Sequence, residues 1–119
     1  MEYHDSEKAK EVATRVEKFM EDEVLPRELE ALRTGDRISF DELEEYWEMA
    51  KDRDLFAPQM PEEYGGQGLD FRDMLPAFEQ VGRSLFGARA IRANAPDEGN
   101  MHTLEIGASE ELKEEYLRP

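Results

Sequence analysis

The chain has 119 residues, a length that suits one domain over residues 1–119 with a single modest core. Its net charge of -15, from 30 acidic and 15 basic residues, disfavours binding to nucleic acid or to anionic membrane surfaces, because their phosphates would be repelled. No apolar run is long enough to span a membrane, and the absence of cysteine excludes disulfides and thiolate metal sites and fits a cytoplasmic protein. Abundant acid with few lysines leads us to expect a salt-adapted, halophilic source.

Apolar residues recur at helical spacing between residues 6 and 25 and form one stripe. They are Val12, Val16, Phe19, Met20 and Val24. Pro26 disfavours helical backbone at the residue before it, so the pattern predicts that this helix ends or kinks there. Residues 34–36 read as a turn.

A second helix has the clearest start signal in the chain. Ser39 and Glu42 form a capping-box pattern, and Ile38 and Leu43 are placed for the accompanying hydrophobic staple. Trp47, the sole tryptophan, is predicted to anchor the core. We expect the helix to fade near Asp54.

Two prolines and three glycines make residues 58–68 a shaped loop. Asp70 is a plausible N-cap for a third helix that buries Met74, Leu75, Phe78 and Val81. Because Pro76 removes one helical hydrogen bond, it predicts a kink, or a helix that begins later than Asp70.

The helical spacing of apolar residues is less clear after residue 85. The sequence at residues 95–100 is expected to break any helix, with a short helix to follow through Met101, Leu104 and Ile106. Ser109 is predicted to cap a last helix, which carries Leu112, Tyr116 and Leu117. The fold class predicted is all-α, a five- to six-helix bundle of orthogonal or up-down form.

The residues show no catalytic constellation. Gly65, Gly66 and Gly68 are not followed by the lysine and hydroxyl residue of a phosphate loop, so they read as a tight turn. His4 and His102 lack the spacing of metal ligands, and neither belongs to a nucleophile motif. The acidic runs read as solvated helix faces.

Three segments together resemble the acyl-CoA dehydrogenases. The run Met60-Pro61-Glu62-Glu63-Tyr64-Gly65-Gly66-Gln67-Gly68-Leu69 looks like the family's P-x-x-Y-G-G-x-G segment, and residues 109–119 look like its S/T-x-E-x-K-x-x-Y/W-L-x-P helix. Between them, residues 95–101 are similar to the branch of the tenth and eleventh human family members. One departure from the family pattern lies near Ile106, where Gly107-Ala108 makes the segment one residue longer than usual.

The resemblance implies the N-terminal helical domain of an enzyme that oxidises acyl-CoA thioesters with FAD, by way of a glutamate base and an electron-transfer flavoprotein or similar acceptor. It also implies a homo-oligomer. The base and most flavin contacts belong to later segments of the family, so no catalytic, flavin-binding or metal-binding residue is expected here. This domain is expected to wall the acyl-chain pocket, with Ala90, Asn94, Ala95 and Asn100 as candidate substrate-binding residues. For each, the alternative is that a small side chain only permits close helix packing.

Three readings of the chain stay open. We expect the chain to be a fragment that lacks the flavin-binding β domain and the C-terminal helical domain, that is inactive alone, and that exposes an apolar face. The alternative is a stand-alone acidic helical module that binds a protein partner without catalysis. A metal-binding helical bundle is a third reading, which the ligand spacing opposes.

Overall fold

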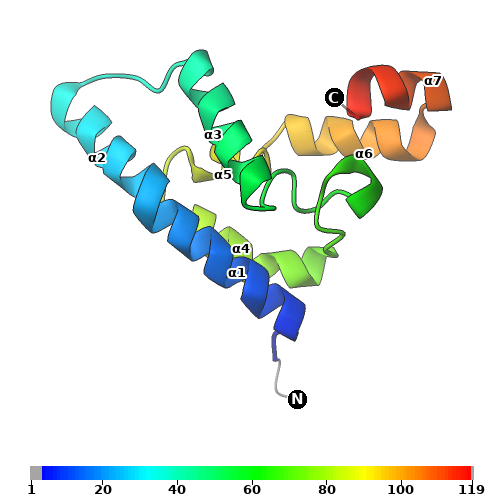
Figure 1. Ribbon diagram of the computed structural model, residues 1–119, viewed down its shortest axis with the longest axis horizontal. Coiled ribbons are helices and arrows are strands. Elements are labelled where there is room, and N and C mark those ends of the chain that lie inside the picture. The colour runs from blue at the N-terminus through cyan, green and yellow to red at the C-terminus, as the bar shows by residue number, and fades with distance from the viewer. Residues whose placement is uncertain (1–3, 119) are drawn as a thin grey trace.

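The computed structural model describes residues 4–118, which form a flattened body of 46 × 42 × 22 Å. Within that range every regular element is helical, which confirms the all-α prediction (Figure 1). Counting α1, η1 and α2 as one run, and α7 and η3 as another, the described residues hold six helical segments besides one short 3₁₀ turn. None of their helices is long and apolar enough to cross a membrane.

The first helix runs well past Pro26. The helix α1 (Glu7–Phe19) passes through a π-helical turn, η1 (Met20–Val24), directly into α2 (Leu25–Thr34), and Figure 1 shows one long continuous coil. The expected end at Pro26 is therefore wrong. Pro26 lies in the first turn of α2, where a missing N–H is tolerated, and the wider turn before it changes the hydrogen-bond register. The helix ends at Gly35, which has a φ of 78°.

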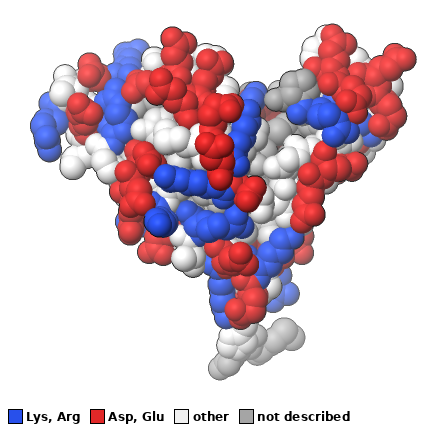
Figure 2. Space-filling view, viewed as in Figure 1, with Lys and Arg blue, Asp and Glu red and all other residues white. Residues whose placement is uncertain are grey.

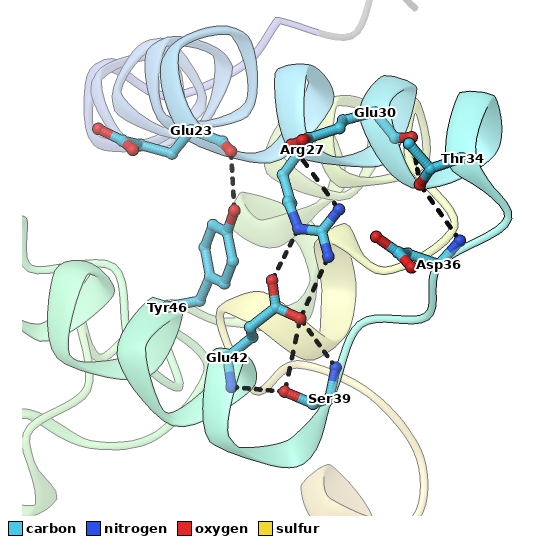
Figure 3. A network of polar contacts seen from close by, with 8 residues as sticks. All are labelled: Glu23, Arg27, Glu30, Thr34, Asp36, Ser39, Glu42 and Tyr46. Atoms are coloured by element: carbon cyan, nitrogen blue, oxygen red, sulfur yellow. Dashed lines mark hydrogen bonds and ion pairs between the residues drawn. The ribbon is translucent and has the colours of Figure 1, made fainter.

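The helix α3 (Phe40–Asp52) begins as predicted. The Ser39 hydroxyl accepts from the Glu42 N–H, and the Glu42 carboxylate accepts from the Ser39 N–H, so both halves of the capping box are present. Glu42 also accepts from Arg27 of α2, with Nε 2.7 Å from Oε1 (Figure 3). One carboxylate thus caps α3 and ties it to the preceding helix.

These contacts change the charge state of Glu42. The hydrogen bond from Arg27, followed by that from the Ser39 N–H, lowers the pKa of Glu42 to about 2. Beside it, the Tyr46 hydroxyl donates to the Glu23 carbonyl at 3.0 Å, and burial raises the pKa of Tyr46 (Figure 3). Glu42 therefore stays ionised far into the acid range, and Tyr46 stays protonated as a donor.

The helix α4 (Phe71–Val81) begins immediately after Asp70, whose side chain accepts from the Asp73 N–H. The helix continues through Pro76, so the alternative of a later start is wrong. Packing along α1 stabilises it and buries Met74 and Val81. Leu75, which we expected to be buried, is exposed, because it lies off the face that meets α1.

The last third of the chain forms an arm. The short α5 (Gly87–Ala90) is followed by α6 (Asp97–Gly107), then by α7 (Glu110–Leu112) and the π-helical η3 (Lys113–Leu117). The predicted break over residues 95–100 is wrong beyond Pro96, since α6 already begins at Asp97. Ser109 caps α7 as predicted, by accepting from the Leu112 N–H.

Two apolar clusters hold these segments together. The larger lies between α1, α3, α4 and α5, and Trp47 packs against it with its indole N–H donated to the Arg89 carbonyl at 2.8 Å. The smaller lies beneath α6 and contains Ala57, Met60 and Leu117. The short 3₁₀ turn η2 (Glu62–Tyr64) leads into the glycine-rich loop between α3 and α4.

Candidate functional site

One side of α6 is covered by the rest of the domain and the other is not. Met101 and Leu104 pack on the smaller cluster, whereas an adjoining stripe of the helix faces solvent. The exposed stripe consists of Gly99, Asn100, Thr103, Ile106 and Gly107. We call these five residues the open face of α6. A Cβ atom added at Gly99 or Gly107 would meet no atom within 4 Å.

A hollow of about 230 Å³ lies beside the N-terminal half of α6, against α4. Glu98 and His102 line it from α6, and the walls from α4 and the preceding loop are largely apolar. The apolar lining consists of Leu69, Phe71, Met74 and Phe78, and the polar side chains of Gln59 and Asp70 also line the hollow. The rings of Phe71 and Phe78 lie 6.5 Å apart, and Phe71 is exposed. We call this space the α4–α6 hollow, and its lining suits an apolar chain.

The polar side chains of the α4–α6 hollow differ in whether they have hydrogen-bond partners. The Nδ1 atom of His102 lies 3.2 Å from a Glu105 carboxylate oxygen, and its Nε2 lies 4.0 Å from Glu98. Gln59 is only 8% exposed, and neither atom of its amide has a partner among the described residues. Within residues 4–118, no group of three His, Asp or Glu side chains is placed to hold a metal ion.

A second hollow, of about 600 Å³, lies between α3 and the segment that joins α5 to α6. Its lining is more strongly charged, with Arg89, Arg92, Glu44 and Asp97. The Arg92 guanidinium lies 4.5 Å from the centre of the Trp47 ring and 3.3 Å from the Asp97 carboxylate. Such a lining suits an apolar chain less well than the α4–α6 hollow does.

The four predicted substrate-binding residues fall in three different places. Asn94 and Ala95 line the second hollow together. Asn100 lies on the open face of α6. Ala90 is 0% exposed within the larger apolar cluster, where its small side chain permits α5 to pack closely. A direct contact between any of the four and a substrate stays a prediction.

Sequence reasoning missed the α4–α6 hollow. The signal available was the i, i+4 spacing of Met74 with Phe78 and of Glu98 with His102, which places each pair on one helix face. That Gln59 joins them depends on the path of the loop over residues 58–68, which no local pattern specifies.

The backbone of the glycine-rich loop packs tightly against itself and the preceding residues. Gly65 and Gly68 have φ values of 88° and 62°, the left-handed region that favours glycine. A Cβ atom added at Gly66 would lie 2.7 Å from the Ala57 carbonyl oxygen and still closer to that of Met60. The loop thus offers no open cradle for the phosphates of a dinucleotide, and it does not fit a flavin.

Comparison with known proteins places the chain in a family. The profile of the family described as "Acyl-CoA dehydrogenase, N-terminal domain" matches residues 6–119. A solved structure of a putative acyl-CoA dehydrogenase from Mycobacterium abscessus is 31% identical, with a TM-score of 0.80 over 98% of this chain and 32% of that one.

Curated relatives cover the chain to a similar extent. Acyl-CoA dehydrogenase family member 11 of Rattus norvegicus is 32% identical over 96% of this chain and 15% of its own length. The probable acyl-CoA dehydrogenase FadE2 of Mycobacterium tuberculosis is 30% identical over 100% of this chain and 30% of its own. The chain therefore spans less than a third of either curated relative. Since the family profile covers all but its first few residues, this chain belongs to the acyl-CoA dehydrogenase family as an N-terminal domain.

Proposed function

We propose that the whole protein is an FAD-dependent acyl-CoA dehydrogenase and that this domain forms one wall of its acyl-chain pocket. The observation that carries the proposal is the uncovered side of α6, where the open face adjoins the largely apolar α4–α6 hollow. Burial of an acyl chain against apolar walls contributes roughly 0.8 kcal/mol for each methylene. A wall of this kind binds and orients the chain and keeps water from it.

The cofactor is proposed for the segments that the family carries after this domain, since the glycine-rich loop offers no open cradle for its phosphates. FAD would supply the hydride chemistry there, and the present chain would shape the acyl-chain pocket. We also propose an electron-transfer flavoprotein or similar acceptor as partner, a homo-oligomeric assembly, a cytoplasmic location and adaptation to high salt, the last on the charge of -15. The alternative of a stand-alone interaction module finds no support in the family membership.

A substitution at Gly99 tests whether α6 forms a wall of the acyl-chain pocket. Gly99 lies inside α6 with space around its Cα, and glycine in a helix interior costs about 1 kcal/mol relative to alanine. We therefore expect Gly99→Leu to leave the melting temperature of the domain unchanged or higher. In the full-length enzyme the same side chain would occupy space beside the acyl chain and lower kcat/KM for long acyl-CoAs by roughly tenfold relative to short ones.

The control is Arg33→Leu, which places the same side chain on the exposed surface of α2. It should leave the chain-length profile as it is in the parent enzyme. Equal profiles for Gly99→Leu and Arg33→Leu would show that this side of α6 does not face the substrate.

A further inference from the structure

The helix α2 has an apolar side that the described residues leave uncovered. No residue of α2 is buried, and Leu29 and Leu32, which share one helix face, are 58% and 67% exposed. Figure 1 shows α2 at the end of the molecule opposite α6. Contiguous exposed apolar side chains mark a surface that another molecule can cover.

This apolar side borders a groove of about 350 Å³ between α2, the loop that follows it and the segment that leads into α5. The apolar lining consists of Ala31, Leu32, Ile38, Leu85 and Phe86. The Leu85 N–H donates to the Glu28 carboxylate at 2.5 Å, which holds Leu85 beside α2 although its side chain is 86% exposed. Leu29 lies outside the groove, about one turn from Leu32, so a projecting leucine and a groove lie side by side. We call Leu29 and the groove together the α2 surface.

The α2 surface carries no net charge, unlike the chain as a whole. Residues 25–38 contain three arginines and three acidic residues, so the charge of -15 lies elsewhere. The charged side chains that line the groove also balance, and they are Glu28, Asp36, Arg37 and Arg89. Figure 2 shows basic side chains interspersed with acidic ones at the end that holds α2, whereas acidic ones dominate the tip of the arm. Two copies can therefore meet through the α2 surface without an excess of like charge.

A second group of exposed apolar side chains lies in acidic surroundings. Ile106 and Tyr116 are 85% and 63% exposed on the arm, where residues 105–115 contain five acidic residues and one lysine. Contact between two copies there would bring like charges together, which is costly. Self-association is therefore favoured at α2 and opposed at the arm.

We propose that the α2 surface binds a second copy of this chain. In a twofold dimer each contact occurs twice, so Leu29 of each copy enters the groove of the other and packs on Leu85 and Ile38. The apolar centre is small beside the roughly 800 Å² that each partner of a standard interface buries, so the dimer is a weak one. Because α2 lies away from α6, this inference and the proposed acyl-chain wall can fail separately.

Sedimentation equilibrium of the 119-residue chain tests the proposal, since its own apolar clusters hold its helices together. We expect dimers at a chain concentration on the order of 0.1 mM, as suits a weak interface. Because the chains as a whole repel one another, the Kd should fall as sodium chloride rises from about 0.1 M to about 1 M, which shortens the Debye length from about 10 Å to about 3 Å. A chain that stays monomeric throughout this range would overturn the proposal.

Two arginine substitutions form a matched pair for this measurement. Leu85→Arg and Ile106→Arg add the same charge at sites that are 86% and 85% exposed, so neither should disturb the fold. Leu85→Arg should raise the dimer Kd at least about thirtyfold, the effect of losing a central apolar contact. Ile106→Arg should not raise the Kd, because it only lowers the net negative charge. An equal Kd for the two variants would contradict a dimer built on the α2 surface.

Thiol labelling of Leu32→Cys distinguishes a second copy from other occupants of the groove. The chain has no cysteine, so the label reports this position alone. In the 119-residue chain, labelling should slow as the chain concentration rises, whereas Ile106→Cys should react at a constant rate. Labelling that is independent of concentration in this chain but slow in the full-length enzyme would mean that a later segment of the same polypeptide covers the groove. That result would overturn the assignment to a second copy.

Discussion

Gly66→Ala is expected to destabilise the domain by about 3 kcal/mol or more, enough to unfold much of a marginally stable chain. The added Cβ would lie 2.6 Å from the Met60 carbonyl carbon and 2.7 Å from the Ala57 carbonyl oxygen. Both are backbone atoms, so no side-chain rotation relieves the overlap. Met60 and Ala57 are buried, and the Ala57 N–H donates to the Ile91 carbonyl at 2.8 Å, so the segment cannot shift cheaply.

The neighbouring glycine provides the control. Gly65 has a φ of 88° and nothing within 4 Å of an added Cβ, so Gly65→Ala meets only the backbone strain of the left-handed region, about 1–2 kcal/mol. Urea unfolding followed by the fluorescence of Trp47 measures both variants. Equal losses for the two would mean that the close approach at Gly66 is not the reason that glycine is needed there.

Phe19→Ala has the second-largest expected effect on stability. The Phe19 side chain is 0% exposed, its ring meets that of Tyr46 edge-on at 6.3 Å, and the Arg53 guanidinium lies 5.3 Å from its centre. Removing the ring leaves a cavity between α1 and α3, for which a loss of about 3–5 kcal/mol is typical.

Phe71→Ala is the matched control for Phe19→Ala, because Phe71 is 75% exposed. The same change at this position should alter the free energy of unfolding by no more than about 0.5 kcal/mol. Denaturant midpoints of the two variants give the comparison. A loss at Phe19 as small as that at Phe71 would contradict the placement of the core around α1.

Local hydrogen bonding explains which parts of the fold the sequence predicts. Ser39, Asp70 and Ser109 each cap the helix expected of them, because a cap requires only the N–H groups two or three residues further along. The prolines were misjudged for the opposite reason. Pro96 lies directly before α6, where a helix starts and proline is tolerated, and Pro26 follows the π-helical turn of a continuous helix. Whether a helix starts, continues or stops at a proline depends on the packing around it.

The candidate site was predicted only in part, since it is built from segments distant in the chain. The expectation that residues near α6 matter rested on family resemblance. Asn100 lies on the open face of α6, whereas Asn94 and Ala95 line the second hollow, and contact of any of them with a substrate stays a prediction. Ala90 is buried by tertiary packing, which its own sequence context does not reveal. The α4–α6 hollow likewise depends on how the arm that carries α6 lies against α4.

The central claim is that the uncovered side of α6 faces the acyl chain. Its most direct test uses the absence of cysteine from this chain. Gly99→Cys is introduced into the full-length enzyme, with any reactive cysteine of later segments replaced, and the rate of thiol labelling is measured with and without a long-chain acyl-CoA. Arg33→Cys on α2 serves as the reference position. We predict that the acyl-CoA slows labelling at position 99 at least about tenfold and leaves position 33 unchanged, as expected when a ligand covers only one site. Equal labelling of position 99 in the presence and absence of acyl-CoA would contradict the assignment of α6 as a wall of the pocket.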